Sequence, residues 1–182
     1  MPAEDGDVSV GALALACAAQ IHGAPLAPGG PSGQPGPRRR LAPMDLLNGI
    51  PGIHRVPDWL WRPLEIPATA WIHGDLHPGR VLIREGGAGL LGLDGLRPGA
   101  PEEDIASWAA DVLARGHTAD VEAVLGELEE LYSGAGGAPL DPGRLRAVTA
   151  IELLERAASA IRHLEADALL SAARLASIVA SI

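Results

Sequence analysis

The sequence predicts a mainly α-helical single domain, spanning residues 1–182, that contains one small β-hairpin. Of its 182 residues, 47% are apolar, enough for a chain of this length to bury a core of its own. Apolar residues recur at helical spacing in the first 22 residues and again from residue 102 onwards. Between these regions, two short apolar runs flank a glycine-rich turn, which is the pattern of a hairpin.

The N-terminal part is predicted to hold one helix followed by a long irregular segment. The helix covers 8–22 and carries Leu13, Cys17 and Ile21 at the spacing of one packed face. Residues 24–43 contain too many Pro and Gly for regular structure, so they are expected to form a mobile loop. The following stretch, 44–70, is expected to form short helices and turns that pack its Trp residues.

The hairpin is predicted to pair residues 80–84 with residues 89–93. A turn centred on residues 86–87 sets Val81 opposite Gly92, because antiparallel partners on the two strands are directly opposite. This register leaves Arg80, and the loop before it, facing the acid that follows the second strand.

That register brings two carboxylates together. Asp75 precedes the first strand and Asp94 follows the second. Two carboxylates around one small volume can hold a divalent cation, or one can accept a proton while the other binds the metal. The alternative is a surface hairpin with two solvated acids.

Helix signals are clearest in the C-terminal half. Acidic residues at 102–104 suit the start of a helix, because its N-terminal dipole favours negative charge. The remaining helix boundaries are predicted at Thr118 (N-cap), Gly134 (end), Asp141–Pro142 (N-cap and first turn) and a break between His163 and Ala168.

The words HGDLHPG (73–79) and DIASWAAD (104–111), with Asp94 between them, resemble the aminoglycoside phosphotransferase and choline kinase family, which has a protein-kinase-like fold. The resemblance implies that Asp75 is the catalytic base and Asp94 the metal-binding acid. It implies that His73 braces the loop and places His73 and Arg80 on the cofactor-binding side. Position 80 holds Arg where the kinase pattern has a neutral Asn. Asp104 resembles the family acid that is tied back to this loop.

The resemblance also implies cofactors and a substrate class. Intact relatives use ATP and Mg²⁺ to phosphorylate a hydroxyl group on a small molecule. The helix ending at His22 resembles the one that opens the C-terminal lobe, so only that lobe is expected, with the N-terminal lobe absent. The chain contains no Lys, and kinase-like folds use a strand Lys to hold the ATP phosphates. Asp58, Trp59 and Trp61 are candidates for lining the acceptor site.

Two functions of different class follow. One is a small-molecule kinase whose missing lobe comes from another chain or from upstream sequence. The other is a noncatalytic, pseudokinase-like binding module or truncated relic, in which Arg80 pairs with Asp94 and replaces Mg²⁺. An apolar face left uncovered by the absent lobe would favour a homodimer or a partner protein. For these residues alone, the noncatalytic interpretation is favoured.

A metal-dependent hydrolase is a third interpretation. His73, Asp75 and His77 alternate, so on a strand they would share one face. Pro78 and Gly79 argue for a loop instead, and no further His falls at a spacing that completes a site. A G-x-G-x-x-G string at 87–92 lies inside the hairpin, so it is interpreted as turn glycine rather than a nucleotide-binding motif.

Composition excludes other classes. A formal net charge of −9 and only five aromatic residues, four Trp and one Tyr, argue against nucleic acid as a partner. The acidity favours a cationic substrate such as an aminoglycoside. A single Cys17, no basic signal sequence and no long apolar run predict a cytoplasmic protein without a membrane span.

Overall fold

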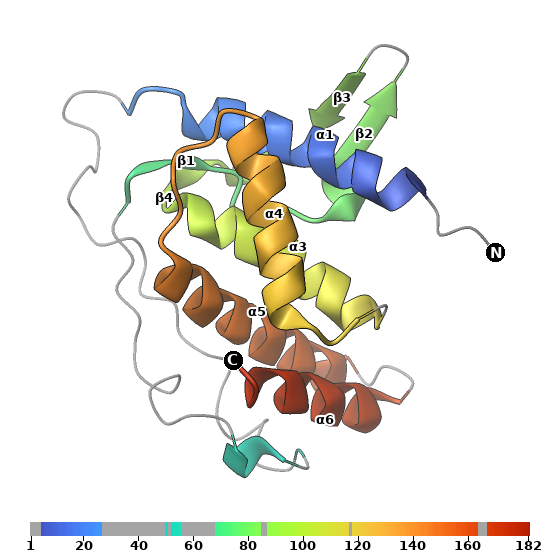
Figure 1. The fold of residues 1–182 in the computed structure, drawn as a ribbon. Helices are drawn as coiled ribbons and strands as arrows, with labels where there is room; N and C mark the ends of the chain where they lie inside the picture. Colours follow the sequence, from blue (N-terminus) through green and yellow to red (C-terminus); the bar gives the residue numbers. More distant parts are fainter. Residues whose placement is uncertain are drawn as a thin grey trace.

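The computed structural model describes residues 5–26, 50, 52–55, 68–84, 87–116, 118–163 and 167–182. The described part is mostly helical, with two small antiparallel sheets, which confirms the mainly α fold class (Figure 1). Its helices are α1 (Asp5–His22), α3 (Pro101–Arg115), α4 (Val121–Gly134), α5 (Pro142–Arg162) and α6 (Ala168–Val179). Its strands are β1 (Ala70–Ile72), β2 (Val81–Arg84), β3 (Gly87–Leu90) and β4 (Arg97–Gly99), and its 3-10 turns are η1 (Ile53–Arg55), η3 (Pro78–Arg80) and η4 (Leu93–Gly95).

Helix α3 lies at the centre of the molecule. It packs on α5 along one side and on α4 and α1 along others, and α6 packs on α5 (Figure 1). Its side chains Ile105 and Leu113 are fully buried, as are Leu153 and Leu154 of α5. Almost the whole first two turns of α3 are buried, so the helix start is held firmly inside the protein.

Most predicted helix boundaries are confirmed. Asp141 caps α5, since its Oδ1 accepts the Arg144 backbone N–H at 2.8 Å, and the predicted break separates α5 from α6. The cap of α4 is a correction: Asp120 Oδ1 accepts the Ala123 N–H at 3.0 Å. Thr118, predicted to be this cap, instead accepts from the Asp120 N–H at 3.0 Å.

The predicted packing face of α1 was wrong. Leu13 is 37% exposed, whereas Leu15 and Ala18 are fully buried, and Cys17 is only half-buried. The apolar residues run almost all round this helix, so periodicity alone did not select a face. Contacts with α4, β1 and β3 select it instead.

The hairpin β2–β3 forms, but in another register. Val81 pairs with Leu90 and Arg84 with Gly87, so the predicted pairing of Val81 with Gly92 was wrong by two residues. The observed register leaves two residues between the strands, which is the commonest hairpin connection. A shift of two residues keeps each side chain on its predicted face of the ladder.

A second antiparallel pair was not predicted. β1 pairs with β4, with Ala70 opposite Gly99 and Ile72 opposite Arg97, where the sequence suggested a loop. This pairing holds together the two ends of the segment 73–96. It therefore brings the loop after β1 beside the turn before β4.

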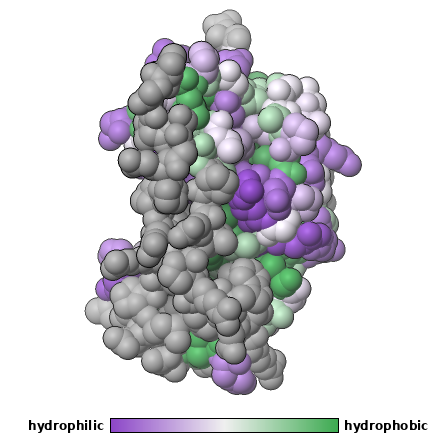
Figure 2. Space-filling view, turned by 90° about the vertical axis from the view of Figure 1, so that its left-hand side faces the viewer, coloured by the Kyte–Doolittle hydropathy of each residue, from purple (hydrophilic) through white to green (hydrophobic). Residues whose placement is uncertain are grey.

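Other predictions lie outside the described residues. These are the loop at 24–43 beyond residue 26, and the segment with Asp58, Trp59 and Trp61. Among the described residues, no helix is both long and apolar enough to cross a membrane. On the face seen in Figure 2, hydrophilic side chains gather in one patch of the described surface, with small hydrophobic areas around it.

Candidate active site

The loop that follows β1 is fixed by a buried acid at the start of α3. Asp104 is fully buried. Its Oδ2 accepts the His73 backbone N–H at 2.7 Å, and its Oδ1 accepts the Gly74 N–H at 2.8 Å. Asp104 therefore ties the start of α3 to the loop after β1, as the resemblance implied.

A second layer holds Asp104 itself. His22 Nε2 lies 3.0 Å from Asp104 Oδ2, and His22 Nδ1 lies 2.8 Å from the Tyr132 hydroxyl. A carboxylate only accepts, so Nε2 carries the proton, and in a neutral ring Nδ1 then accepts from the Tyr132 O–H. The sequence analysis missed this chain, because α1 and α4 meet only in the folded protein.

Tyr132 provides a pH prediction. Burial raises its pKa to about 12, helped by the charges of Glu102 and Asp104 and opposed by a hydrogen bond with the Ala138 backbone. The unfolded chain loses this proton near pH 10, so it binds fewer protons than the folded chain between pH 10 and 12. The free energy of unfolding should therefore fall across this window and not below it.

Absorbance at alkaline pH measures this directly, because Tyr132 is the only tyrosine. Folded protein should show phenolate formation displaced upward from that of the urea-unfolded chain. Coincident titration curves for the two states would contradict the prediction.

Asp75 projects from the loop and is bound by Arg80. The Arg80 Nη2 and Nε donate to Asp75 Oδ2 at 2.5 and 3.1 Å, and His77 Nε2 lies 3.8 Å from the same oxygen. The Asp75 side chain is 55% exposed and that of Arg80 40%. Such an exposed pair adds at most about 1 kcal/mol to stability, but it places a permanent cation on the acid.

The predicted pairing of Arg80 with Asp94 was wrong. Among the described residues Asp94 makes no ion pair, and it lies in the exposed turn η4. The observed register ends β3 at Leu90, and Gly92 then turns the chain with a left-handed φ of 82°. The Arg80 guanidinium lies over that glycine, since a methyl group there would be 3.1 Å from Nη1.

The loop of Asp75 and the turn of Asp94 nevertheless lie side by side. A methyl group at Gly74 would be 3.3 Å from the Gly95 carbonyl oxygen, and one at Gly95 would be 3.3 Å from the His73 carbonyl oxygen. His73 Nε2 lies 2.8 Å from the Leu91 carbonyl oxygen, so His73 braces this contact. The predicted meeting of the two segments is confirmed, although their register is not.

A polar pocket of about 410 Å³ opens beside Asp75. It is lined by Asp75, His77, Ser107, Asp111, Glu152, Glu155, Arg156, Ser159 and Arg162, which come from the loop, α3 and α5. Four carboxylates and two guanidinium groups give this wall a formal charge of −2 with His77 neutral. Arg80 and Arg115, which are not part of this lining, pair with Asp75 and Asp111 and offset that charge. The pocket therefore favours a polar, hydrogen-bonding ligand.

The described residues do not fit a bound Mg²⁺ ion. Mg²⁺ takes oxygen ligands, whereas Arg80, at the position where the resemblance implies a neutral amide, offers none and its guanidinium holds Asp75. No three His, Cys, Asp or Glu side chains in the described part of the chain are grouped to hold a metal. Within that part of the chain, His73, Asp75 and His77 are therefore not grouped as the hydrolase interpretation requires.

The HGDL loop is braced by Asp104 and His73 beside a polar pocket. A sequence model of the phosphotransferase enzyme family matches residues 3–148, which include the loop, Asp94 and Asp104. The chain belongs to this family, and the resemblance seen in the sequence is confirmed. A search of curated proteins finds no match to the chain.

Proposed function

We propose that the chain binds a polar, hydroxyl-bearing small molecule in the pocket beside Asp75, and that alone it does not transfer phosphate from Mg²⁺-bound ATP. The observation that carries this proposal is the bond from Arg80 to Asp75 Oδ2. Membership of the phosphotransferase family indicates the class of ligand. The contact of Arg80 with Asp75 indicates that phosphate transfer is impaired.

The residues that line the pocket support the proposed binding of an acceptor molecule there. Asp75 and His77 contribute one end, and Asp111 and Glu152 contribute another. Asp111 accepts from Arg115 at 2.6 Å and Arg156 at 3.4 Å, so its orientation is fixed before a ligand arrives. A wall whose polar side chains are already held in place binds a hydroxyl-bearing polar ligand with little ordering cost.

The positive charge beside Asp75 is the main reason for the proposed loss of phosphate transfer. In an active site of this family Asp75 would orient and deprotonate the acceptor hydroxyl. The Arg80 guanidinium occupies Asp75 Oδ2, so this oxygen is not free to accept the proton of an acceptor hydroxyl. The chain also has no Lys to hold ATP phosphates, consistent with the described helices corresponding to a C-terminal lobe.

A second candidate is phosphate transfer by this loop when the remaining phosphate-binding groups come from elsewhere. The intact brace supports it, because Asp104 fixes two backbone N–H groups of the loop at 2.7 and 2.8 Å. Asp75 also faces the polar pocket. In that case Arg80 would have to release Asp75 during the reaction.

An Arg80→Asn variant separates the two candidates. Its amide restores a neutral oxygen ligand and frees Asp75, so we expect Mn²⁺, a paramagnetic stand-in for Mg²⁺, to bind at least about tenfold more tightly in the presence of ATP, a change of about 1.4 kcal/mol. Water-proton relaxation measures this affinity. Arg84→Asn, an equivalent change at an exposed position of β2, should behave like the wild type.

The wild-type chain should bind an aminoglycoside saturably in calorimetry, and added salt should weaken that binding. Transfer of phosphate from ATP to the aminoglycoside should stay at background. Wild-type turnover, or tight Mn²⁺ binding with Arg80 present, would favour the second candidate over the first.

A further inference from the structure

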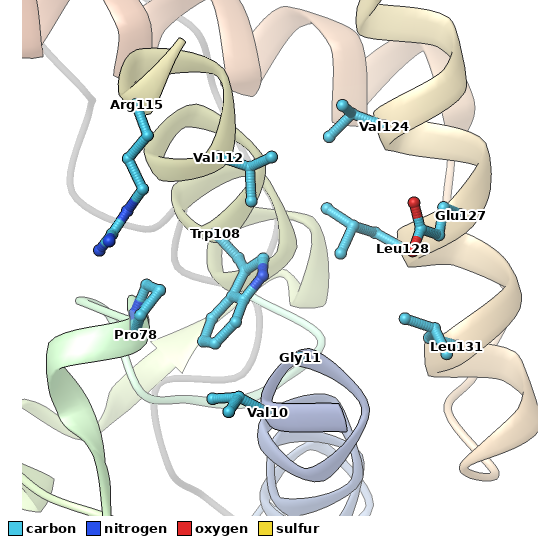
Figure 3. A pocket seen from close by; sticks show the side chains of 10 residues that line it. All are labelled: Val10, Gly11, Pro78, Trp108, Val112, Arg115, Val124, Glu127, Leu128 and Leu131. Atoms are coloured by element: carbon cyan, nitrogen blue, oxygen red, sulfur yellow. The ribbon is translucent and has the colours of Figure 1, made fainter. Parts of the chain in front are cut away.

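A second pocket lies away from the polar site. It has a volume of about 240 Å³ and opens between α1, α3 and α4. The loop that carries Asp75 touches one edge of it through Pro78 (Figure 3). Its walls are mostly apolar. The lining residues are Val10, Gly11, Pro78, Trp108, Val112, Arg115, Val124, Glu127, Leu128 and Leu131.

Trp108 gives this pocket a hydrogen-bond donor. The side chain is only 4% exposed, and its indole nitrogen points into the space between α3 and α4 (Figure 3). No described residue accepts a hydrogen bond from this N–H. This nitrogen is not one of the fully enclosed unpaired polar atoms of the described residues, so it is open to the pocket. A ligand that carries an acceptor can take this hydrogen bond in place of water.

The charged groups at the rim restrict the ligand further. Arg115 already donates from Nε to Asp111 Oδ2 at 2.6 Å, so its charge is compensated. Within the described part of the chain, the exposed carboxylate of Glu127 has no such ion pair, and it lies on the pocket side of α4 (Figure 3). An anionic ligand would meet uncompensated negative charge there.

The size of the pocket sets the scale of the ligand. A dry apolar cavity of about 150 Å³ is large enough to bind benzene, so a pocket of about 240 Å³ accommodates a molecule of two fused rings. Aromatic rings pack well against the face or edge of an indole.

We propose that this pocket is a binding site for a small, uncharged aromatic alcohol, with its rings against Trp108 and its hydroxyl oxygen accepting the indole N–H. The site is separate from the proposed acceptor pocket and does not depend on the function assigned to it. Because Pro78 forms part of the wall, a bound molecule lies directly against the loop that carries Asp75.

The first test compares 2-naphthol with naphthalene, which has the same rings without the hydroxyl. Calorimetry on the full chain at neutral pH should show saturable one-to-one binding of 2-naphthol, and about five- to tenfold weaker binding of naphthalene, which is the usual contribution of one hydrogen bond. Trp108→Phe keeps an aromatic ring but removes the donor. In that variant the two compounds should bind with equal affinity.

The second test fills the pocket from the opposite wall. A Cβ at Gly11 would lie 3.8 Å from the Trp108 ring, so Gly11→Leu projects a side chain into the cavity without a backbone clash. Leucine also favours a helix more than glycine does, by about 0.8 kcal/mol, so the variant should fold. We expect it to weaken 2-naphthol binding at least about tenfold, as removal of most of the buried contact area requires.

Gly126→Leu is the matched control. Gly126 also lies within a helix, and a side chain there would meet nothing within 4 Å, so binding should stay unchanged. The proposal is overturned if the wild type shows no saturable binding of 2-naphthol up to millimolar concentration. It is equally overturned if Gly11→Leu binds as tightly as the wild type, or if Trp108→Phe preserves the preference for 2-naphthol.

Discussion

Replacing Asp104 with alanine is expected to lower the free energy of unfolding by about 3–5 kcal/mol. The change leaves the buried His73 N–H and the half-buried Gly74 N–H without their acceptor, and it removes the partner of His22 Nε2. The free energy of unfolding of a typical domain is only about 5–15 kcal/mol, so this substitution removes a large part of it. The loop that carries Asp75 should also become mobile.

Urea denaturation measures the stability loss, and hydrogen exchange at the His73 and Gly74 amides reports on the loop. Asp94→Ala is the control, because that acid is exposed and makes no ion pair within the described structure; it should change stability by less than about 0.5 kcal/mol. Equal effects of the two substitutions would show that Asp104 does not brace the loop.

A methyl group on Gly99 is also expected to destabilise the protein, with a cost of about 1–3 kcal/mol. Gly99 is buried in β4, and an added Cβ would clash with the Ile72 side chain and lie 2.6 Å from Glu103 Oε1. That carboxylate oxygen already accepts the Ala100 N–H at 3.1 Å. Gly99→Ala should therefore push β4 away from β1 and separate the Asp75 loop from the Asp94 turn.

Gly89→Ala is the matched substitution in the other sheet, where a methyl group would meet nothing within 4 Å. It should leave stability unchanged or slightly raised, since alanine loses less conformational entropy than glycine on folding. Thermal unfolding of both variants, at equal protein concentration, provides the comparison. A midpoint for Gly99→Ala as high as that of Gly89→Ala would contradict the proposed crowding.

The helices could be predicted because their signals are local. The cap at Asp141 and the break after His163 follow from a few neighbouring residues, and the structure confirms both. The packed face of α1 could not be predicted from its sequence, because a helix that is apolar nearly all round shows no preferred side. Its contacts with α4 and β3 decide which residues are buried.

The residues of the candidate site likewise fall into those that the sequence predicted and those that only the structure revealed. The HGDL loop and the acids at 75, 94 and 104 could be recognised from sequence, and so could the departure at Arg80. The partner of Arg80 could not, because a hairpin shifted by two residues changes which acid its guanidinium reaches. His22 and Tyr132 carried no motif. His22 contacts Asp104 from 82 residues away along the chain, and Tyr132 contacts His22 from 110 residues away.

The sequence by itself determined the family, the helical class and the residue types available for chemistry, since these depend on composition, short-range periodicity and a continuous motif. Only the tertiary structure decided that Arg80 holds Asp75 and that Asp104 supports the loop from beneath. It also revealed an unpaired indole N–H in a second pocket. These features arise where segments that are distant in sequence meet. Their geometry is set by strand register and helix packing, which short-range sequence preferences do not determine.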